Sequence, residues 1–399
     1  FRVSERSSMS SSEKTPAKGL ATRLAHMGRY PKEFHGFVNP PVVHASTVLF
    51  PDTKTMLSGA QTYHYARRGN PTTNALEDAV AELEGAHGAH LAPSGLGAVS
   101  LALLSAVSSG DHLLVTDSVY GPTRNLAEKM LKRMGVEVDY YDPTIGAGIA
   151  ELFKPNTRAV MTEAPGSLTF EMQDLPAIVE AAHARDALVV MDNTWATPVY
   201  FDAIGHGVDL SVQAGTKYLV GHSDAMLGTV AASERAWERL DETYGALGMH
   251  VAPDDVYLGL RGLRTLKVRL ERHMESGLEI ARWLEGRPEV SRVRHPGLES
   301  DPGHALWARD FTGASGLFAF DFTDDVTFEQ SCAFLDALEL FGLGYSWGGF
   351  ESLAIPVRLK GARTATPVPG NASIRLHIGL EDTADIRADL EAGFAALRG

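Results

Sequence analysis

Two charged residues follow strongly apolar stretches in the middle of the chain, and their types suggest covalent chemistry. Asp192 ends the run in LVVMDNTWATP, and Lys217 lies further along in SVQAGTKYLVGHSDAMLGT. Each should sit where a buried strand ends, the edge of an open α/β sheet at which ligands bind. A buried lysine is costly unless it is paired, neutral or tied up in an imine. Taken singly, Lys217 could equally be a solvated loop residue and Asp192 a turn residue.

A third stretch, APSGLGAVS at residues 92–100, opens an expected helix with glycines. Backbone N–H groups at a helix N-terminus can point at a phosphate, helped by the helix dipole, although an ordinary tight turn has the same composition. A phosphate cradle, a strand-end acid and a strand-end lysine are the parts that pyridoxal 5′-phosphate requires. The lysine forms a Schiff base, and the acid keeps the pyridine nitrogen protonated. The three stretches together therefore predict pyridoxal 5′-phosphate as the cofactor.

A fourth stretch, YHYARRGNPT at residues 63–72, presents Tyr65, Arg67 and Arg68 at the end of an irregular N-terminal segment. Arginine is suited to bidentate binding of phosphate or carboxylate, and a solvated basic turn is the alternative. The histidines of GAHGAH, His87 and His90, have no evident third ligand, so no metal site is expected.

Helices alternate with short apolar strands from Pro71 onward, which indicates an α/β layer with a mostly parallel sheet. Near residue 263 a long amphipathic helix, LRTLKVRLERHMESGLEIARWLEG, begins a region typical of a smaller α+β domain. We expect an N-terminal arm at 1–69, a cofactor-binding domain at 70–263 and a C-terminal domain at 264–399. Helices are expected over 71–86, 95–110, 122–135, 175–186, 263–286, 328–341 and 383–397, and strands over 111–118, 158–166, 187–194, 208–216, 225–232, 289–296, 316–322 and 373–379.

Composition limits the kinds of partner. The 399 residues carry a formal net charge of −14, which argues against nucleic acid or an anionic membrane. No apolar run approaches the roughly 20 residues that span a bilayer. The one cysteine, Cys332, excludes an internal disulfide, suits a reducing cytoplasm and lies in an apolar stretch typical of a core. Residues 1–19 are expected to be disordered or, for residues 1–8, a leader ahead of a native Met9.

Several ordered motifs resemble the Cys/Met-metabolism family of pyridoxal-phosphate enzymes, from about residue 20 to the end of the chain. They are YARRGNPT, VYGPT, DNTWATP, TKYLVGHSDAM, RGLRT, SWGGFESL and IRLHIGLED. The resemblance implies the aspartate-aminotransferase-like fold, called fold type I, and a small amino acid as substrate. It also implies a homotetramer built from dimers with shared active sites. Trp347 and the run RDFTGASGLFAF look most like bacterial members that cleave cystathionine on the β side.

The resemblance also assigns roles to individual residues. Lys217 would hold the cofactor and move the Cα proton, Asp192 would pair with the pyridine nitrogen, and Tyr120 would stack on the ring. The N–H groups of Gly95 and Leu96 and the hydroxyl of Thr216 would bind the phosphate of the cofactor. Tyr65 and Arg67 would bind the phosphate in the neighbouring subunit. Arg375 would bind the substrate α-carboxylate with Ser346 and Trp347 beside it, and Tyr65 and Arg68 would contact the rest of the substrate. Many family members have serine where this chain has Ala214, so one phosphate hydrogen bond is expected to be lost or replaced by water.

The implied reaction is β-elimination of L-cystathionine to homocysteine, pyruvate and ammonia, a transsulfuration step of methionine biosynthesis. A γ-lyase, a γ-synthase or a cysteine desulfhydrase on the same scaffold remains the alternative, because all of them begin with loss of the Cα proton. A binding or regulatory protein that kept the fold is a second alternative. The presence of Lys217, Asp192 and Arg375 speaks against that reading.

Overall fold

The computed structural model describes residues 18–359, 363–368 and 372–397. The expectation for residues 1–19 therefore lies outside the described residues, except for Lys18 and Gly19. Within the described ranges, no helix is long and apolar enough to cross a membrane.

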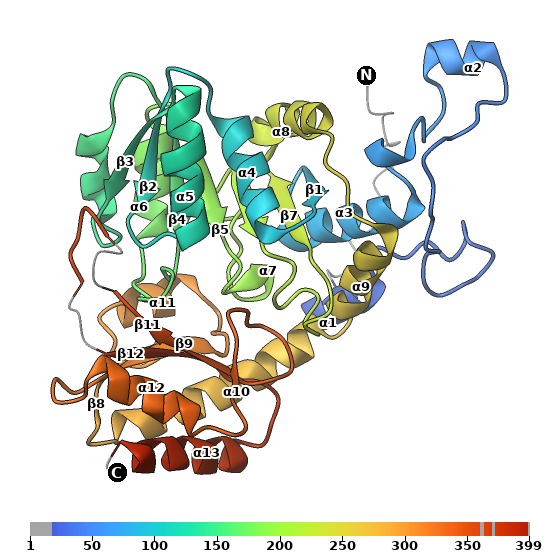
Figure 1. Cartoon of the computed structure of the whole chain (residues 1–399). Coiled ribbons are helices and arrows are strands. Elements are labelled where there is room, and N and C mark those ends of the chain that lie inside the picture. The colour runs from blue at the N-terminus through green and yellow to red at the C-terminus, as the bar shows by residue number, and fades with distance from the viewer. Residues whose placement is uncertain (1–17, 360–362, 369–371, 398–399) are drawn as a thin grey trace.

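A seven-stranded sheet forms the centre of the larger domain (Figure 1). Its order is β1 (Gly88–Ala92), β7 (Gly228–Ala232), β6 (Leu210–Gln213), β5 (Leu188–Asp192), β4 (Thr157–Glu163), β2 (His112–Thr116) and β3 (Glu137–Tyr141). β7 runs antiparallel to both of its neighbours, and the pairs among β2, β3, β4, β5 and β6 are parallel. The mostly parallel sheet that the sequence predicted is confirmed.

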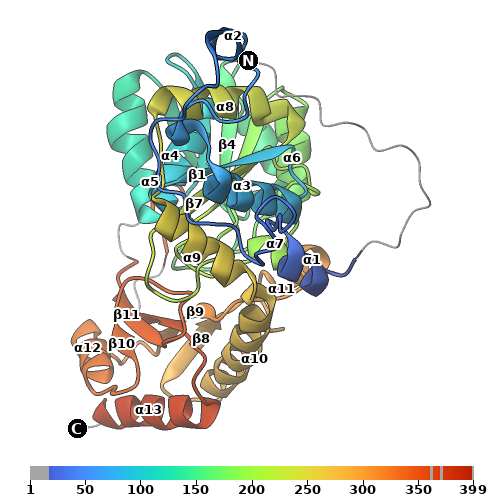
Figure 2. The same ribbon diagram turned by 90° about the vertical axis from the view of Figure 1, so that its right-hand side faces the viewer.

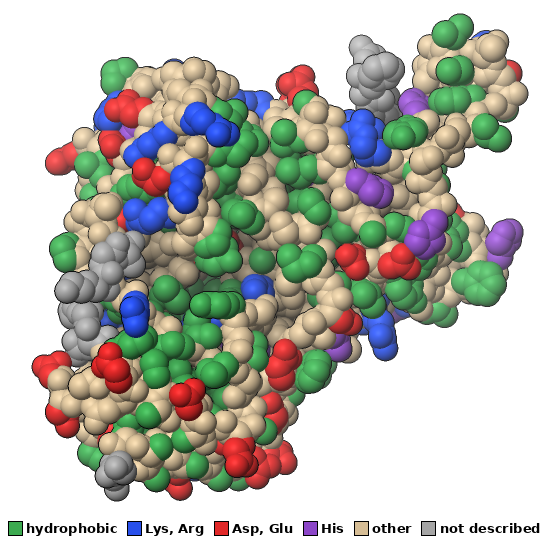
Figure 3. Space-filling model, in the orientation of Figure 1, with side chains coloured by type: hydrophobic (Ala, Val, Ile, Leu, Met, Phe, Trp, Pro, Cys, Tyr) green, Lys and Arg blue, Asp and Glu red, His purple; other side chains and the backbone are tan. Residues whose placement is uncertain are grey.

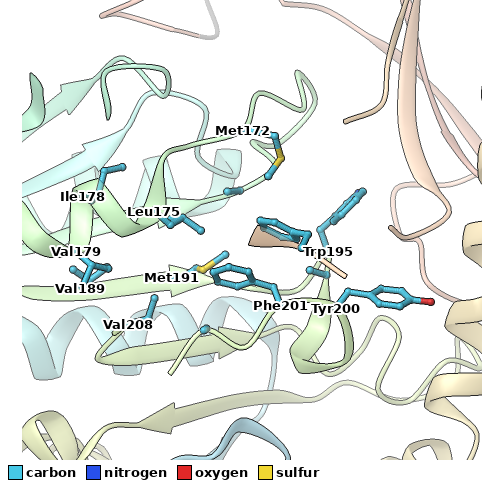
Figure 4. Packing of buried hydrophobic residues seen from close by; sticks show 14 of the residues in the cluster. Met172, Leu175, Ile178, Val179, Val189, Met191, Trp195, Tyr200, Phe201 and Val208 are labelled. Atoms are coloured by element: carbon cyan, nitrogen blue, oxygen red, sulfur yellow. The ribbon is translucent and has the colours of Figure 1, made fainter. Parts of the chain in front are cut away.

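Helices cover both faces of this sheet, so its strands are buried on both sides and read as continuous apolar runs. One face packs on α4 (Gly95–Ala106) and α8 (Glu234–Leu247), beside α5 (Gly121–Leu126). The other packs on α3 (Pro71–Glu84), α6 (Leu175–His183), α7 (Thr197–Tyr200) and α9 (Pro253–Leu263). Figure 4 shows Leu175 and Ile178 of α6 against Val189 and Met191 of β5, which fixes the strand that ends at Asp192.

In the larger domain, two of the predicted helices differ most from the structure. α4 stops at Ala106 rather than at Gly110, because Val107 is extended and the Asp111 carboxylate accepts the Ser108 N–H at 2.7 Å to form a turn. The segment predicted as one helix over 122–135 is α5, followed by a π-helical stretch at Ala127–Leu131 and a 3₁₀ turn at Lys132–Met134.

The smaller domain consists of a second sheet with helices on its outer face (Figure 2). Its five strands are ordered β10 (Gly342–Leu343), β11 (Leu353–Val357), β12 (Ser373–His377), β9 (Leu317–Phe322) and β8 (Val290–Arg294). The helices on that face are α10 (Leu266–Glu285), α12 (Phe328–Asp336) and α13 (Thr383–Ala396). α11 (His304–Asp310) lies toward the larger domain, where Trp307 packs against the core cluster that contains α6 and Arg309 pairs with Asp174 at 2.7 Å. α12 ends before the predicted residue 341, because Asp389 of α13 accepts the N–H groups of residues 339–341. The division at residue 263 stays a prediction.

The chain before α3 extends away from the body of the molecule, with α1 (Leu20–His26) packed near α10 and α2 (Thr53–Ser58) far from it (Figure 1). Large apolar side chains on this arm face solvent: Phe37 is 71% exposed, Leu49 84% and Leu57 87%. Several such side chains on one segment are typical of a surface that another protein covers.

Glu84, near the end of α3, is a buried acid away from the predicted site. Its Oε1 accepts hydrogen bonds from Gln213 at 2.7 Å and Ser211 at 3.1 Å, and its Oε2 has no partner among the described residues. Burial raises the pKa of Glu84 to about 8. The unfolded chain ionises this carboxyl at ordinary acidic pH, whereas the folded chain keeps it protonated. The group therefore costs stability progressively as the pH rises from about 4.5 toward 8.

We predict that Glu84→Gln stabilises the protein at pH 8 and leaves it nearly unchanged at pH 5. The amide keeps both hydrogen bonds and has no charge to gain. The gain in unfolding free energy at pH 8 should be on the order of a few kcal/mol, measured by urea denaturation. Glu151→Gln, at an exposed position, is the control and should show no pH-dependent gain. An equal effect of Glu84→Gln at both pH values would contradict the prediction.

Candidate active site

The residues predicted to act together meet at one edge of the large sheet. The turn after β1 leads to Gly95, β2 leads to Tyr120, β5 ends at Asp192, and β6 leads to Lys217. These strands run in the same direction, so their carboxyl ends share an edge. The space-filling view shows a hollow between the two domains, lined by apolar and basic side chains (Figure 3).

Lys217 is held at this edge by the smaller domain. Its Nζ donates to the Ser346 Oγ at 2.8 Å and lies 5.3 Å from the centroid of the Trp347 ring. Burial, and after it the nearby charge of Arg375, lower the pKa of Lys217 to about 8, against the opposing effect of Asp192. About a tenth of this amine is therefore neutral at pH 7 and about half at pH 8, and the neutral form is the one that a nucleophile or base requires.

The loop that carries Ser346 approaches the lysine closely because it contains glycines. Gly348 has φ +81°, and a Cβ on it would lie 2.9 Å from the carbonyl carbon of Lys217. Any larger residue at 348 would push this loop away from Lys217 and strain the backbone.

Asp192 and a second acid, Glu163, end neighbouring strands and pair in register. Asp192 accepts hydrogen bonds from the N–H and the hydroxyl of Thr194, at 3.0 and 2.5 Å. Burial raises the pKa of Asp192, and burial together with the charge of Asp192 raises that of Glu163 well above its usual range. The Oε2 of Glu163 accepts the Tyr120 N–H at 2.7 Å, which fixes the backbone that carries this ring. Sequence reasoning missed Glu163, although it ends the apolar run RAVMTE as Asp192 ends its own.

Arg375 and Tyr120 lie close enough for the charge of the guanidinium to act on the pKa of the tyrosine. The Nη2 of Arg375 donates to the carbonyl groups of Tyr345 at 2.8 Å and Ser346 at 3.2 Å, and the other guanidinium nitrogens have no described partner. Burial lowers the pKa of Arg375 to about 10, so the side chain stays cationic. Burial raises the pKa of Tyr120, and Asp192 and Glu163 add to this effect. A cation with free donors facing the site is suited to a carboxylate.

The beginning of α4 has the features of an anion cradle. The Ser94 hydroxyl accepts the Gly97 N–H and the Ser94 carbonyl the Ala98 N–H, whereas no described group accepts the N–H of Gly95 or Leu96. A Cβ on Gly95 would lie 2.5 Å from that of Ala214, so only glycine permits this approach.

The hydroxyl of Thr216 is already engaged elsewhere. It donates to the Leu227 carbonyl at 3.1 Å and accepts the Leu227 N–H at 2.9 Å. A hydroxyl has one proton, so Thr216 would have to release the Leu227 carbonyl in order to donate to a phosphate. Its predicted phosphate contact stays a prediction.

The structure does not bring the arm residues to Lys217 of the same chain. Arg67 donates to the Gly245 carbonyl at 3.3 Å, and Arg68 pairs with Asp241 at 3.2 Å. His90 is bound between Asp241 and Glu77. The side chain of Tyr65 is half-exposed. The roles of Tyr65, Arg67 and Arg68 therefore stay predictions that require a second subunit.

The donor set fits pyridoxal 5′-phosphate. Two free N–H groups begin α4, a buried carboxylate is ready for the ring nitrogen, and a half-buried lysine has a lowered pKa. The sheet, the smaller domain and this site define a fold type I pyridoxal-phosphate enzyme. The chain belongs to the family described as Cys/Met metabolism PLP-dependent enzymes, whose model matches residues 21–395.

Similar proteins span nearly the whole chain. A candidate cystathionine β-lyase of Rhizobium johnstonii is 58% identical over 95% of this chain and 96% of its own length. The cystathionine β-lyase of Salmonella typhimurium is 44% identical over 95% of this chain and 99% of its own. The solved structure of cystathionine γ-lyase from Lactobacillus plantarum, in complex with L-serine, is 29% identical with a TM-score of 0.87, covering 96% of this chain and all of that one.

We predict that the amine of Lys217 titrates near pH 8 in the cofactor-free protein. Pulses of acetic anhydride at increasing pH, followed by peptide mass spectrometry, should give a midpoint close to that value. Lys154 is the internal control, because hydrogen bonds to Asp139 and Glu137 raise its pKa. It should react slowly over the same range, and identical profiles for the two lysines would refute the prediction.

Proposed function

We propose that this protein is a carbon–sulfur lyase that cleaves L-cystathionine by β-elimination to homocysteine, pyruvate and ammonia, a step in methionine biosynthesis. The observation that carries the proposal is the Lys217 amine, 2.8 Å from Ser346 and beside the Trp347 ring, next to the charge of Arg375. Relatives that span the chain with up to 58% identity and bear the name of this activity support it.

Arg375 and Lys217 divide the work on the amino acid. The free donors of Arg375 bind the α-carboxylate and so place Cα next to the Lys217 amine. The neutral amine takes the Cα proton, and Ser346 limits where that amine can point. When bound, the cofactor supplies the electron sink for the electrons left at Cα. Proton transfer by a positioned group of this kind contributes about 10²–10⁴ in rate.

The choice between β- and γ-cleavage depends on the space around the substrate side chain. In β-elimination the Cα–H bond breaks toward Lys217 and the Cβ–S electron pair leaves with the thiolate. The three-carbon fragment is released and hydrolyses to pyruvate and ammonia. γ-Elimination also needs a base and room for proton removal at Cβ. Trp347 is a large ring beside the Lys217 amine, which favours the direct loss of the thiolate.

The second candidate is γ-cleavage on the same scaffold. The similarity of the L. plantarum γ-lyase structure, with a TM-score of 0.87, favours it. Because both reactions begin with the same proton transfer, the residues around Lys217 support either one. The identity of the keto acid decides between them.

We predict that L-cystathionine gives pyruvate with homocysteine as the main products. The test is incubation with the purified holoenzyme and chromatographic separation of the keto acids. Lys217→Ala should give neither keto acid, which controls for other enzymes in the preparation. Formation of 2-oxobutyrate with cysteine as the main products would place this chain with the γ-lyases.

The arm supports a proposal about assembly. Its exposed apolar side chains need a cover, and Arg67 and Arg68, which were expected at the phosphate and at the substrate, contact α8 of their own chain instead. A second copy would cover the arm and receive Tyr65 and Arg67 in its site. We therefore propose a dimer with shared sites, paired into a homotetramer. We also propose that the protein is located in the cytoplasm, which its single cysteine favours.

We predict that two inactive variants restore activity when they are combined. Co-refolding of Arg67→Ala with Lys217→Ala chains should give hybrid dimers in which one of the two sites is intact. About half of the wild-type rate per hybrid dimer is expected. The control is Arg67→Ala with Tyr65→Phe, a pair in which every site retains one altered arm. No recovery in confirmed Arg67/Lys217 hybrids would mean that each site is built from one chain.

A further inference from the structure

Two buried histidines behind the site each have a ring nitrogen without a described partner. His273 lies on α10 and His377 on β12, their ring centroids are 5.2 Å apart, and the residues are 0% and 1% exposed. The nitrogens without a partner are the Nε2 of His273 and the Nδ1 of His377. Buried polar atoms are rarely left without a hydrogen bond, so this pair requires a physical account.

The hydrogen bond of His273 fixes the position of its proton. Its Nδ1 lies 2.8 Å from the Ile378 carbonyl, which can only accept. Burial lowers the pKa of His273 to about 4, so the ring is neutral. The proton is therefore on Nδ1, and Nε2 presents a lone pair toward the interior.

His377 faces two groups of the loop that holds Lys217. Its Nε2 lies 3.1 Å from the Gly348 N–H and 3.1 Å from the Gly349 carbonyl. A single nitrogen of a neutral ring cannot both accept and donate. With the proton on Nδ1, Nε2 accepts the Gly348 N–H, and Nδ1 becomes a donor. The available acceptor is then the lone pair of the neighbouring His273, reached through one buried water because the two nitrogens make no direct hydrogen bond.

We propose that His377 is a positioning residue, whose proton is placed by His273 and whose Nε2 holds the turn at Gly348 against Lys217. The route from His377 to the chemistry is short. Gly348 packs on the backbone of Lys217. It also directly follows Ser346 and Trp347 in the loop, so a shift of Gly348 moves both of these residues. The catalytic consequence rests on the proposed function, whereas the support of the loop does not.

The aromatic packing around the loop gives a second reason. The Tyr218 ring, next in sequence to Lys217, lies 5.5 Å from Trp347, 5.2 Å from His273 and 6.0 Å from His377, measured between centroids. The two histidines and the tryptophan thus enclose one ring beside the lysine. A change at His377 should move Trp347 even when the cofactor is absent.

The test compares His377→Phe, His377→Gln and a matched control, His295→Phe. His295 is also wholly buried, accepts one backbone N–H, from Gly297 at 3.0 Å, and has an Nε2 without a described partner. Its ring neighbour is Trp195 rather than Trp347. The chain has five tryptophans, so ¹⁹F NMR of the 5-fluorotryptophan-labelled, cofactor-free protein can follow both, with Trp347→Phe and Trp195→Phe used for assignment.

We expect His377→Phe to shift or broaden the Trp347 resonance and spare Trp195, and His295→Phe to do the reverse. In the holoenzyme, kcat with L-cystathionine should fall about tenfold or more in His377→Phe, with KM changed less than about threefold. His377→Gln keeps an oxygen that can accept the Gly348 N–H, so it should recover most of kcat. If His377→Phe does not fold, the kcat of His377→Gln and its Trp347 resonance, both compared with the wild type, test the proposal instead.

An unmoved Trp347 resonance in His377→Phe, or a kcat that is unchanged, overturns the proposal. A His377→Gln variant as impaired as one without any acceptor overturns it as well. If the wild-type protein does not produce pyruvate from cystathionine, the proposed function fails. The support of the loop by His377 is then still judged by the NMR comparison alone.

Discussion

The structure depends on how it holds one amine, that of Lys217, which is half-buried and has its pKa lowered to about 8. The end of β6 brings the lysine to the sheet edge, but the large domain alone does not hold its tip. The smaller domain supplies the Ser346 hydroxyl, the Trp347 ring and the Arg375 charge. The site therefore exists only where the two domains meet, which explains why the contacts between them are specific. Trp195 donates to the Leu317 carbonyl at 2.8 Å, and the Tyr218 hydroxyl accepts the Gly316 N–H at 3.1 Å.

The sequence allowed the central part of the site to be predicted because long apolar strands end in single charged residues. Asp192 and Lys217 follow from that pattern, and the same pattern could have identified Glu163. Ser346, Trp347 and Arg375 came from family resemblance, since nothing local marks a short loop or a mid-strand arginine as part of a site. The contact of Thr216 with Leu227 could not be predicted from the sequence either, because it depends on how the chain folds back over the eleven residues between them.

The fold was predictable at the level of layers and less so in its details. Burial on both faces gives β2, β4 and β5 their continuous apolar runs, and the parallel sheet follows from them. The strands β1, β3, β10 and β11 were not anticipated. β3, with the sequence EVDYY, is exposed at alternate positions at the sheet edge. The antiparallel direction of β7 depends on the connection that contains Lys217, and the composition of β7 does not indicate that direction.

Charge balance explains how these residues act together at neutral pH. Glu163 and Asp192 are two acids at the ends of paired strands. Lys217 and Arg375 are two basic residues, and the positive charge of Arg375 lowers the pKa of Lys217. Burial and like-charge repulsion make it costly to ionise both members of either pair. Two hydrogen bonds from Thr194 favour the charged form of Asp192, so Glu163 retains its proton. Arginine keeps its proton more strongly than lysine, so Lys217, whose pKa is about 8, is the base that loses its proton, in about a tenth of the molecules at pH 7. One anion for a ring nitrogen, one cation for a carboxylate and one neutral amine for a proton remain, and these are the three charge states that the proposed reaction needs.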